Sequence, residues 1–202
     1  IRNVVRFIEK LMRNDPDVSV LGGHALITSD MNLSIVSGQV KSLAFAFIAV
    51  ALILMLVFRS VSAGFFASFP LLLAELILFG IMGYSGVRLD AATALLSSLM
   101  IGIGVDYTIH FLWRYRSEHH KGKTPEEAVR ITLLGSGKGI VFNAWSVIVG
   151  FAALIFSAFR PVQYFGFLVI ISISVCLMAA LVLVPAMCMV WKPAFLEKRR
   201  KK

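Results

Sequence analysis

Long apolar runs, separated by short polar connections, make up most of this chain. A membrane-spanning helix needs about 20 predominantly apolar residues to cross a hydrocarbon core of ~30 Å. Five runs can each do so, and they cover residues 43–58, 64–84, 91–113, 139–158 and 163–191. Prolines at 70 and 185 fall within two of them, where they are expected to kink the helix or mark its end. The pattern predicts an all-α transmembrane bundle of five spans.

Composition supports this class. The chain is 58% hydrophobic and 15% charged, whereas soluble domains are roughly 45–50% apolar and about 25% charged. The net charge is +9, but no nucleic-acid-binding motif accompanies it. The basic residues lie beside the apolar runs, as the positive-inside rule predicts. We therefore expect the partner to be the lipid bilayer and not nucleic acid.

The distribution of Lys and Arg predicts the orientation. One set of connections holds Arg59, the basic 114–138 loop and the tail 192–202, while the opposite set holds only Arg88 and Arg160. The first set is expected in the cytoplasm. With five spans the N-terminus is then extracytoplasmic and the C-terminus cytoplasmic, in the inner membrane of a bacterial cell.

Residues 1–42 have a different pattern. Apolar residues at 1, 4, 5, 8, 11 and 12 share one helical face, and "DVSVL" (17–21) alternates like a strand before two glycines. We expect a small extracytoplasmic α/β remnant here, with helix resuming near Ala25. The chain starts at Ile1 without a signal-like segment, so we interpret it as a fragment whose N-terminal part is missing.

The 114–138 loop is expected to carry a short interfacial helix near 125–134. "TPEE" provides an N-cap at Thr124, Pro125 at the first position and Glu127 to complete a capping box. Gly135 is expected to end the helix. A structural role and a regulatory one are both open for it.

A carboxylate interrupts the third span. Asp106, in "GIGVDYTIHFLWRYR" (102–116), lies slightly cytoplasmic of the middle of the span, where an Asp costs about 2.5–3.5 kcal/mol on insertion scales. Such residues usually face a bundle interior or a water cavity. Helical spacing places it in a polar, small-residue stripe made of Ser98, Gly102, Asp106 and His110.

The fourth span has a matching stripe of Gly139, Asn143, Ser146, Gly150 and Ala153. We expect the two stripes to face each other, with Asn143 or Ser146 near Asp106 and with Gly102, Gly104, Gly139 and Gly150 as helix-packing positions. Such surroundings suit a group that binds and releases protons. The alternative is a permanently protonated Asp106 that only joins helices.

Two other polar residues in the spans have two readings each. His110 either relays a proton or is an interfacial residue, and Glu75 either lines the pathway or bonds to a neighbouring helix. Tyr107 points roughly 100° away from Asp106 around the helix.

Three further signals carry no site. "GSGKG" (135–139) lacks the first Gly and the Ser or Thr of a phosphate loop. The pair His119-His120 has no other ligand at metal-binding spacing. Cys176 and Cys188 are about 18 Å apart on one helix, too far for a disulfide.

"GIGVDYTIHFLWRYR" resembles a motif span of the resistance-nodulation-division (RND) superfamily, in its MMPL-type exporter branch. The segments "LVFRS", "YSGVRLDAATALLSS", "EEAVRITLLGSGKGIVFNA", "PVQYFGFLVIISI" and "LVPAM" follow in the same order. The likeness covers nearly the whole chain.

The resemblance implies a role and a missing partner. Such exporters have two similar halves, and this chain resembles the end of an extracytoplasmic porter-like domain (1–42), five spans (43–191) and a basic tail (192–202) of the second half. The resemblance implies proton-driven export of lipids or other hydrophobic compounds, with the proton as the coupling ion. Exporters of this type are monomers or trimers. We expect no cofactor, no metal and no enzymatic activity. Asp106 and Tyr107 match the proton-relay pair.

Two other functions stay open. The sterol-sensing proteins of the Patched and Dispatched type have related spans, so a lipid- or sterol-sensing module without transport is the alternative. A structural membrane subunit is the third.

Overall fold

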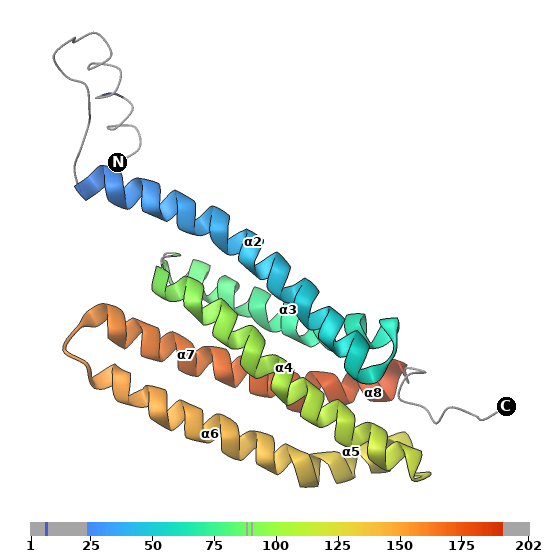
Figure 1. The fold of residues 1–202 in the computed structure, drawn as a ribbon. Coiled ribbons are helices and arrows are strands. Elements are labelled where there is room, and N and C mark those ends of the chain that lie inside the picture. The colour runs from blue at the N-terminus through green and yellow to red at the C-terminus, as the bar shows by residue number, and fades with distance from the viewer. Residues whose placement is uncertain (1–6, 8–23, 88, 90, 192–202) are drawn as a thin grey trace.

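The computed structural model describes Phe7, residues 24–87, Leu89 and residues 91–191. Its long helices are α2 (His24–Phe58), α3 (Val61–Tyr84), α4 (Ala91–His120), α6 (Lys138–Ala152) and α7 (Arg160–Met178), with the shorter α5 (Pro125–Thr132) and α8 (Val184–Trp191) (Figure 1). No strand occurs in these residues. The predicted helix and strand before residue 22 lie outside the described part, apart from Phe7.

Five helical segments are long and apolar enough to cross a membrane, which confirms the all-α membrane bundle. They are Ser37–Phe58, Val61–Tyr84, Thr93–His120, Pro125–Phe156 and Arg160–Trp191. Helices suit this environment because each satisfies its backbone N–H and C=O groups internally, without water. Helix resumes at His24, as predicted, and continues into the first span.

Three helices form the centre of the bundle, and two flank it. The spans built on α3, α4 and α7 bury the largest shares of their apolar surface, while those of α2 and α6 bury little. Helix α7 packs against α3, α4 and α6, and it lies between the N-terminal part of α4 and the C-terminal part of α6 (Figure 1). Helix α6 therefore approaches the face of α4 that carries Asp106 only near the start of α6.

The connection between α4 and α6 differs from the predicted loop. Helix α4 continues to His120, about two turns beyond its expected end. Its last turns are held by the buried Glu118, whose Oε1 accepts from Arg114 Nη2 at 3.0 Å and from Lys121 Nζ at 2.8 Å. Gly122, at φ +89°, then makes the turn. The end of α4 predicted from hydropathy was too early, because hydropathy does not register the local ion pairs of Glu118.

The start of α5 is as predicted, but its end is not. Thr124 Oγ1 accepts from the Glu127 N–H at 3.3 Å, and Glu127 Oε2 accepts from the Thr124 N–H at 3.1 Å, so the capping box is present. Gly135 does not end the helix. It lies in a π-helical turn, Leu133–Gly137, that leads directly into α6, because the extra residue of a π turn bends a helix without breaking it.

The last span bends in the same way. A second π-helical turn, Ala179–Leu183, joins α7 to α8 just before Pro185. Proline cannot donate to the carbonyl four residues earlier and its ring crowds that carbonyl, and a widened turn relieves both effects. Pro70 lies buried inside α3, which continues on both sides of it.

Candidate functional site

Asp106 lines a hollow of about 250 Å³ between α4 and the start of α6. Tyr107 and His110 from α4, Ser136 from the π turn, and Gly139, Ile140 and Asn143 from α6 complete the lining. Asp106 lies near the middle of the span Thr93–His120, yet its side chain is 55% exposed. Because a carboxylate is not stable against lipid tails, this open side must face water or other polar groups.

His110 contacts Asp106 directly. Its Nε2 lies 3.3 Å from Asp106 Oδ1, one turn along α4, and 66% of its side chain is exposed. The contact is an ion pair when the imidazole is protonated and an N–H···O hydrogen bond when the neutral ring carries its proton on Nε2. The predicted relay residue therefore touches the predicted proton-binding group.

Tyr107 belongs to both the hollow and the core. It lines the Asp106 hollow, but it is only 1% exposed and its hydroxyl has no hydrogen-bond partner among the described residues. This agrees with the expectation that it points away from Asp106 around the helix. A buried phenol without a partner is uncommon, which makes this hydroxyl a candidate for a role beyond packing.

The two polar stripes meet only in part. Asn143 lines the same hollow as Asp106, whereas Ser98, Ser146 and Gly150 do not. Ser146 donates to Phe142 O of its own helix at 2.9 Å. The stripes come together near the π turn, and farther along α7 separates their helices.

Only one of the four glycines predicted to pack helices together makes a close contact in the described residues. A Cβ at Gly104 would meet Leu71 Cδ2 at 2.6 Å and Cys176 Sγ at 3.2 Å, so Gly104 does bring α4 close to α3 and α7. The other three positions proposed for packing, Gly102, Gly139 and Gly150, have nothing within 4 Å of such an atom. They do not pack helices of the described chain together, because their faces of α4 and α6 are open.

Ser136 is the polar residue of the hollow that the sequence did not point to. It was placed in a segment expected to end a helix, and the rejected "GSGKG" was the only signal near it. The π turn keeps the helix intact and brings Ser136 into the hollow. The signal that could have predicted this bend is the run of small residues at 135–137 between two helical patterns, with no Pro among them.

Glu75 lies apart from this hollow. It is 3% exposed on α3, and both carboxylate oxygens lack a hydrogen-bond partner among the described residues. Both cysteines are buried and free, as their spacing predicted.

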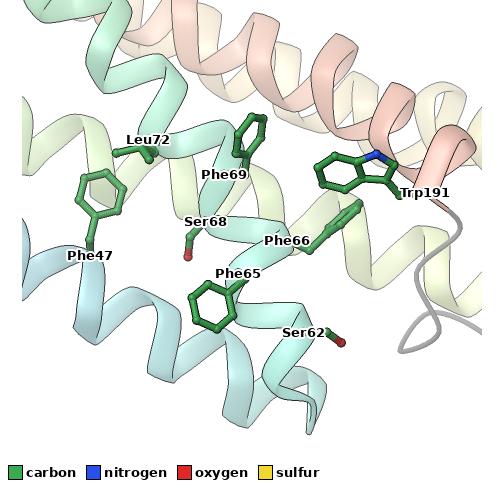
Figure 2. A pocket seen from close by; sticks show the side chains of 8 residues that line it. All are labelled: Phe47, Ser62, Phe65, Phe66, Ser68, Phe69, Leu72 and Trp191. Carbon is green, nitrogen blue, oxygen red and sulfur yellow. The ribbon is translucent and has the colours of Figure 1, made fainter.

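A second, larger hollow is apolar. It measures about 790 Å³ and lies between α2, α3 and α8 (Figure 2). Phe66 and Phe69 lie beside Trp191 there, with ring centroids 5.9 and 6.2 Å from it. Its lining contains no charged group: Phe47, Ser62, Phe65, Phe66, Ser68, Phe69, Leu72 and Trp191. The carboxyl groups of Asp106 and Glu75, both inside membrane spans, lie outside this apolar hollow.

The chain is similar to several membrane proteins. It is 31% identical over 143 residues to MJ1562 of Methanocaldococcus jannaschii and 31% over 156 residues to YdgH of Bacillus subtilis, both named as membrane proteins. It is 29% identical over 111 residues to the sulfolipid-1 exporter MmpL8 of Mycobacterium tuberculosis. These matches cover 71%, 74% and 54% of the chain, but only 37%, 17% and 10% of the relatives.

A family model settles the relationship. The model of the MMPL family matches residues 1–202. Together with the relatives and the five apolar helices, this match shows that the chain belongs to the MMPL family of multi-pass membrane proteins.

Proposed function

We propose that this chain forms part of a proton-driven exporter of lipids or other hydrophobic compounds, with Asp106 as the proton-binding group. The observation that carries the proposal is the open carboxylate of Asp106 in the middle of an apolar span, beside His110 at 3.3 Å. The name of MmpL8 as a sulfolipid-1 exporter supports the substrate class.

Protonation changes the energetics of this site. An ionised Asp106 requires water or a cation near it, whereas the neutral acid tolerates an apolar neighbour. Binding a proton therefore permits α4 to move against whatever covers its open face, and releasing the proton reverses the movement. A membrane potential supplies about 2.3 kcal/mol per charge per 100 mV to drive this cycle.

The neighbouring residues have distinct parts in this cycle. His110 passes the proton along α4, since an imidazole can accept a proton on one ring nitrogen and donate one from the other. Asn143 offers an amide to the carboxyl across the hollow, and Tyr107 closes its inner wall. The α5 end of the bundle lies in the cytoplasm. The open face of α4 is where a second half of the transporter docks.

The experiment uses the gene in its own cells, so that no substrate has to be guessed. Lipids on the cell surface and in the medium are profiled by mass spectrometry for wild type, a deletion and Asp106→Asn, with and without a protonophore. We expect the same hydrophobic species to be lost from the surface in the deletion, in Asp106→Asn and under protonophore. Glu126→Gln, an exposed carboxylate on α5, is the matched control.

Two results oppose the proposal. Normal surface lipids in Asp106→Asn, at equal protein abundance, would show that export does not use this carboxylate. A deletion that changes lipid synthesis without changing lipid distribution, independently of the proton gradient, would favour a lipid- or sterol-sensing module.

A further inference from the structure

The buried carboxyl group of Glu75 has no charge to balance it among the described residues. Glu75 is 3% exposed, and neither oxygen is hydrogen-bonded within the described residues. The ion pairs that the structure shows involve Asp106 and Glu118 and not Glu75. An isolated carboxylate in such a place costs far more than a neutral acid. Glu75 therefore holds a proton in this conformation.

The surroundings of Glu75 are polar but incomplete. Ser97 of α4 faces it, and the Ser97 hydroxyl is buried and without a partner at hydrogen-bond distance. A protonated carboxyl can donate to a hydroxyl, while an ionised one cannot donate at all. The Ser97 hydroxyl can donate to the carboxyl in either protonation state, so it solvates Glu75 without supplying a charge that balances it.

Glu75 lies at the junction of the three central helices. Leu71, one turn before it on α3, meets α4 at Gly104, where Cys176 of α7 also approaches. Cys176 Sγ lies 3.6 Å from the carbonyl oxygen of Met100 on α4. The thiol is within electrostatic range of Glu75 on one side and of Tyr107 on the other.

This junction adjoins the inner wall of the Asp106 hollow. Tyr107 lines the hollow, and its unpartnered hydroxyl lies in the buried core, toward Cys176. We propose that Glu75 is a second proton-binding site of the bundle, enclosed where α3, α4 and α7 meet and connected to the Asp106 hollow through Tyr107. A role of this proton in transport rests on the proposed function. The protonation of Glu75 does not depend on it.

The groups that face Glu75 make it a site for a proton and not for a metal ion. Elements packed against α3 are α2, α4, α7, the turn after α7 and, through Trp191, α8, whose one titratable group is the buried Cys188. Among their described side chains, α4 contributes Tyr107 and Ser97 to the cluster and α7 contributes Cys176. Lys41 of α2 is exposed, and the turn Ala179–Leu183 has no titratable group. A metal ion would lack the several oxygen ligands it requires.

Infrared spectroscopy of the full-length protein in lipid tests this directly. A protonated carboxyl has a C=O band that an ionised one lacks. We expect Glu75→Gln to remove one such band and Asp106→Asn to leave it. In the wild-type protein, the shift of this band in D₂O is expected to be slow. Tyr107→Phe is expected to slow that shift further while leaving the band in place. Where Glu75→Gln fails to fold, Glu75→Asp is expected to move the band.

The opposing outcomes are equally specific. If Glu75→Gln, or Glu75→Asp in its place, leaves every acid band unchanged, Glu75 is ionised and the site does not exist. If the band shifts at once in D₂O, the carboxyl is open to water and not enclosed. If Tyr107→Phe exchanges as fast as wild type, the connection through Tyr107 is wrong. None of these readouts requires export, so they stand apart from the test of the proposed function.

Discussion

The imidazole of His110 lies 3.3 Å from the carboxylate of Asp106, one turn farther along α4. Both side chains are more than half exposed, on a face of α4 that α6 approaches only near the start of α6. This pair is the polar centre of an otherwise apolar span, and its open side is where water, or a docking partner, can change its charge.

A double-mutant cycle measures the link between these two residues. Asp106→Asn removes the charge of the pair and His110→Ala removes its partner, so their effects on thermal unfolding in detergent are expected to be less than additive. Because the pair is exposed and lies at i, i+4, the coupling in stability should be below about 1 kcal/mol. The coupling in lipid export should be nearly complete, with the double variant no worse than Asp106→Asn. Fully additive effects on export would separate His110 from the proton site.

Gly64 should be a stringent packing position. A Cβ there would lie 2.8 Å from the Ala51 carbonyl oxygen of α2 and 2.6 Å from Met55 Cγ. Because the backbone carbonyl cannot step aside, Gly64→Ala is expected to push α2 away from α3 and to destabilise the protein by about 1–3 kcal/mol. Gly80→Ala on the same helix is the control, since nothing lies within 4 Å of its Cβ position. Equal melting temperatures for the two variants would refute the close contact.

The capping box should hold the start of α5. Thr124→Ala removes the acceptor of the Glu127 N–H, so it is expected to cost about 0.5–2 kcal/mol and to speed amide hydrogen exchange in the first turn. Glu126→Ala, next to the box but outside it, serves as the control. If both variants exchange at the wild-type rate, the cap contributes nothing to the stability of α5.

The sequence predicted the number and type of the membrane elements well, and their ends less well. Apolar length alone located five spans. The end of α4 depends on Glu118 and its two basic neighbours, and the continuity of α5 with α6 depends on a π turn around Gly135. Hydropathy does not register either effect, because both are local contacts within and between turns.

The candidate site was predicted in the same partial way. Periodicity placed Asp106 and His110 together, and it placed Asn143 near them, because i, i+4 spacing is fixed by the helix. It did not reveal that α7 separates the N-terminal part of α4 from the C-terminal part of α6, since the order of helices in a bundle is set by packing between distant segments. For the same reason Gly104, and not Gly102, is the close contact.

The most direct test of the proposed function is the protonation of Asp106 itself. Infrared difference spectra of the full-length protein in lipid, recorded between acidic and alkaline pH, should show an acid C=O band that grows at low pH as the carboxylate bands decline. Other carboxylates of the chain contribute to this change, so the Asp106 signal is the component that Asp106→Asn removes and Glu75→Gln keeps. An Asp106 band that stays constant across the pH range would contradict proton exchange there, and would identify a permanently protonated residue that only joins helices.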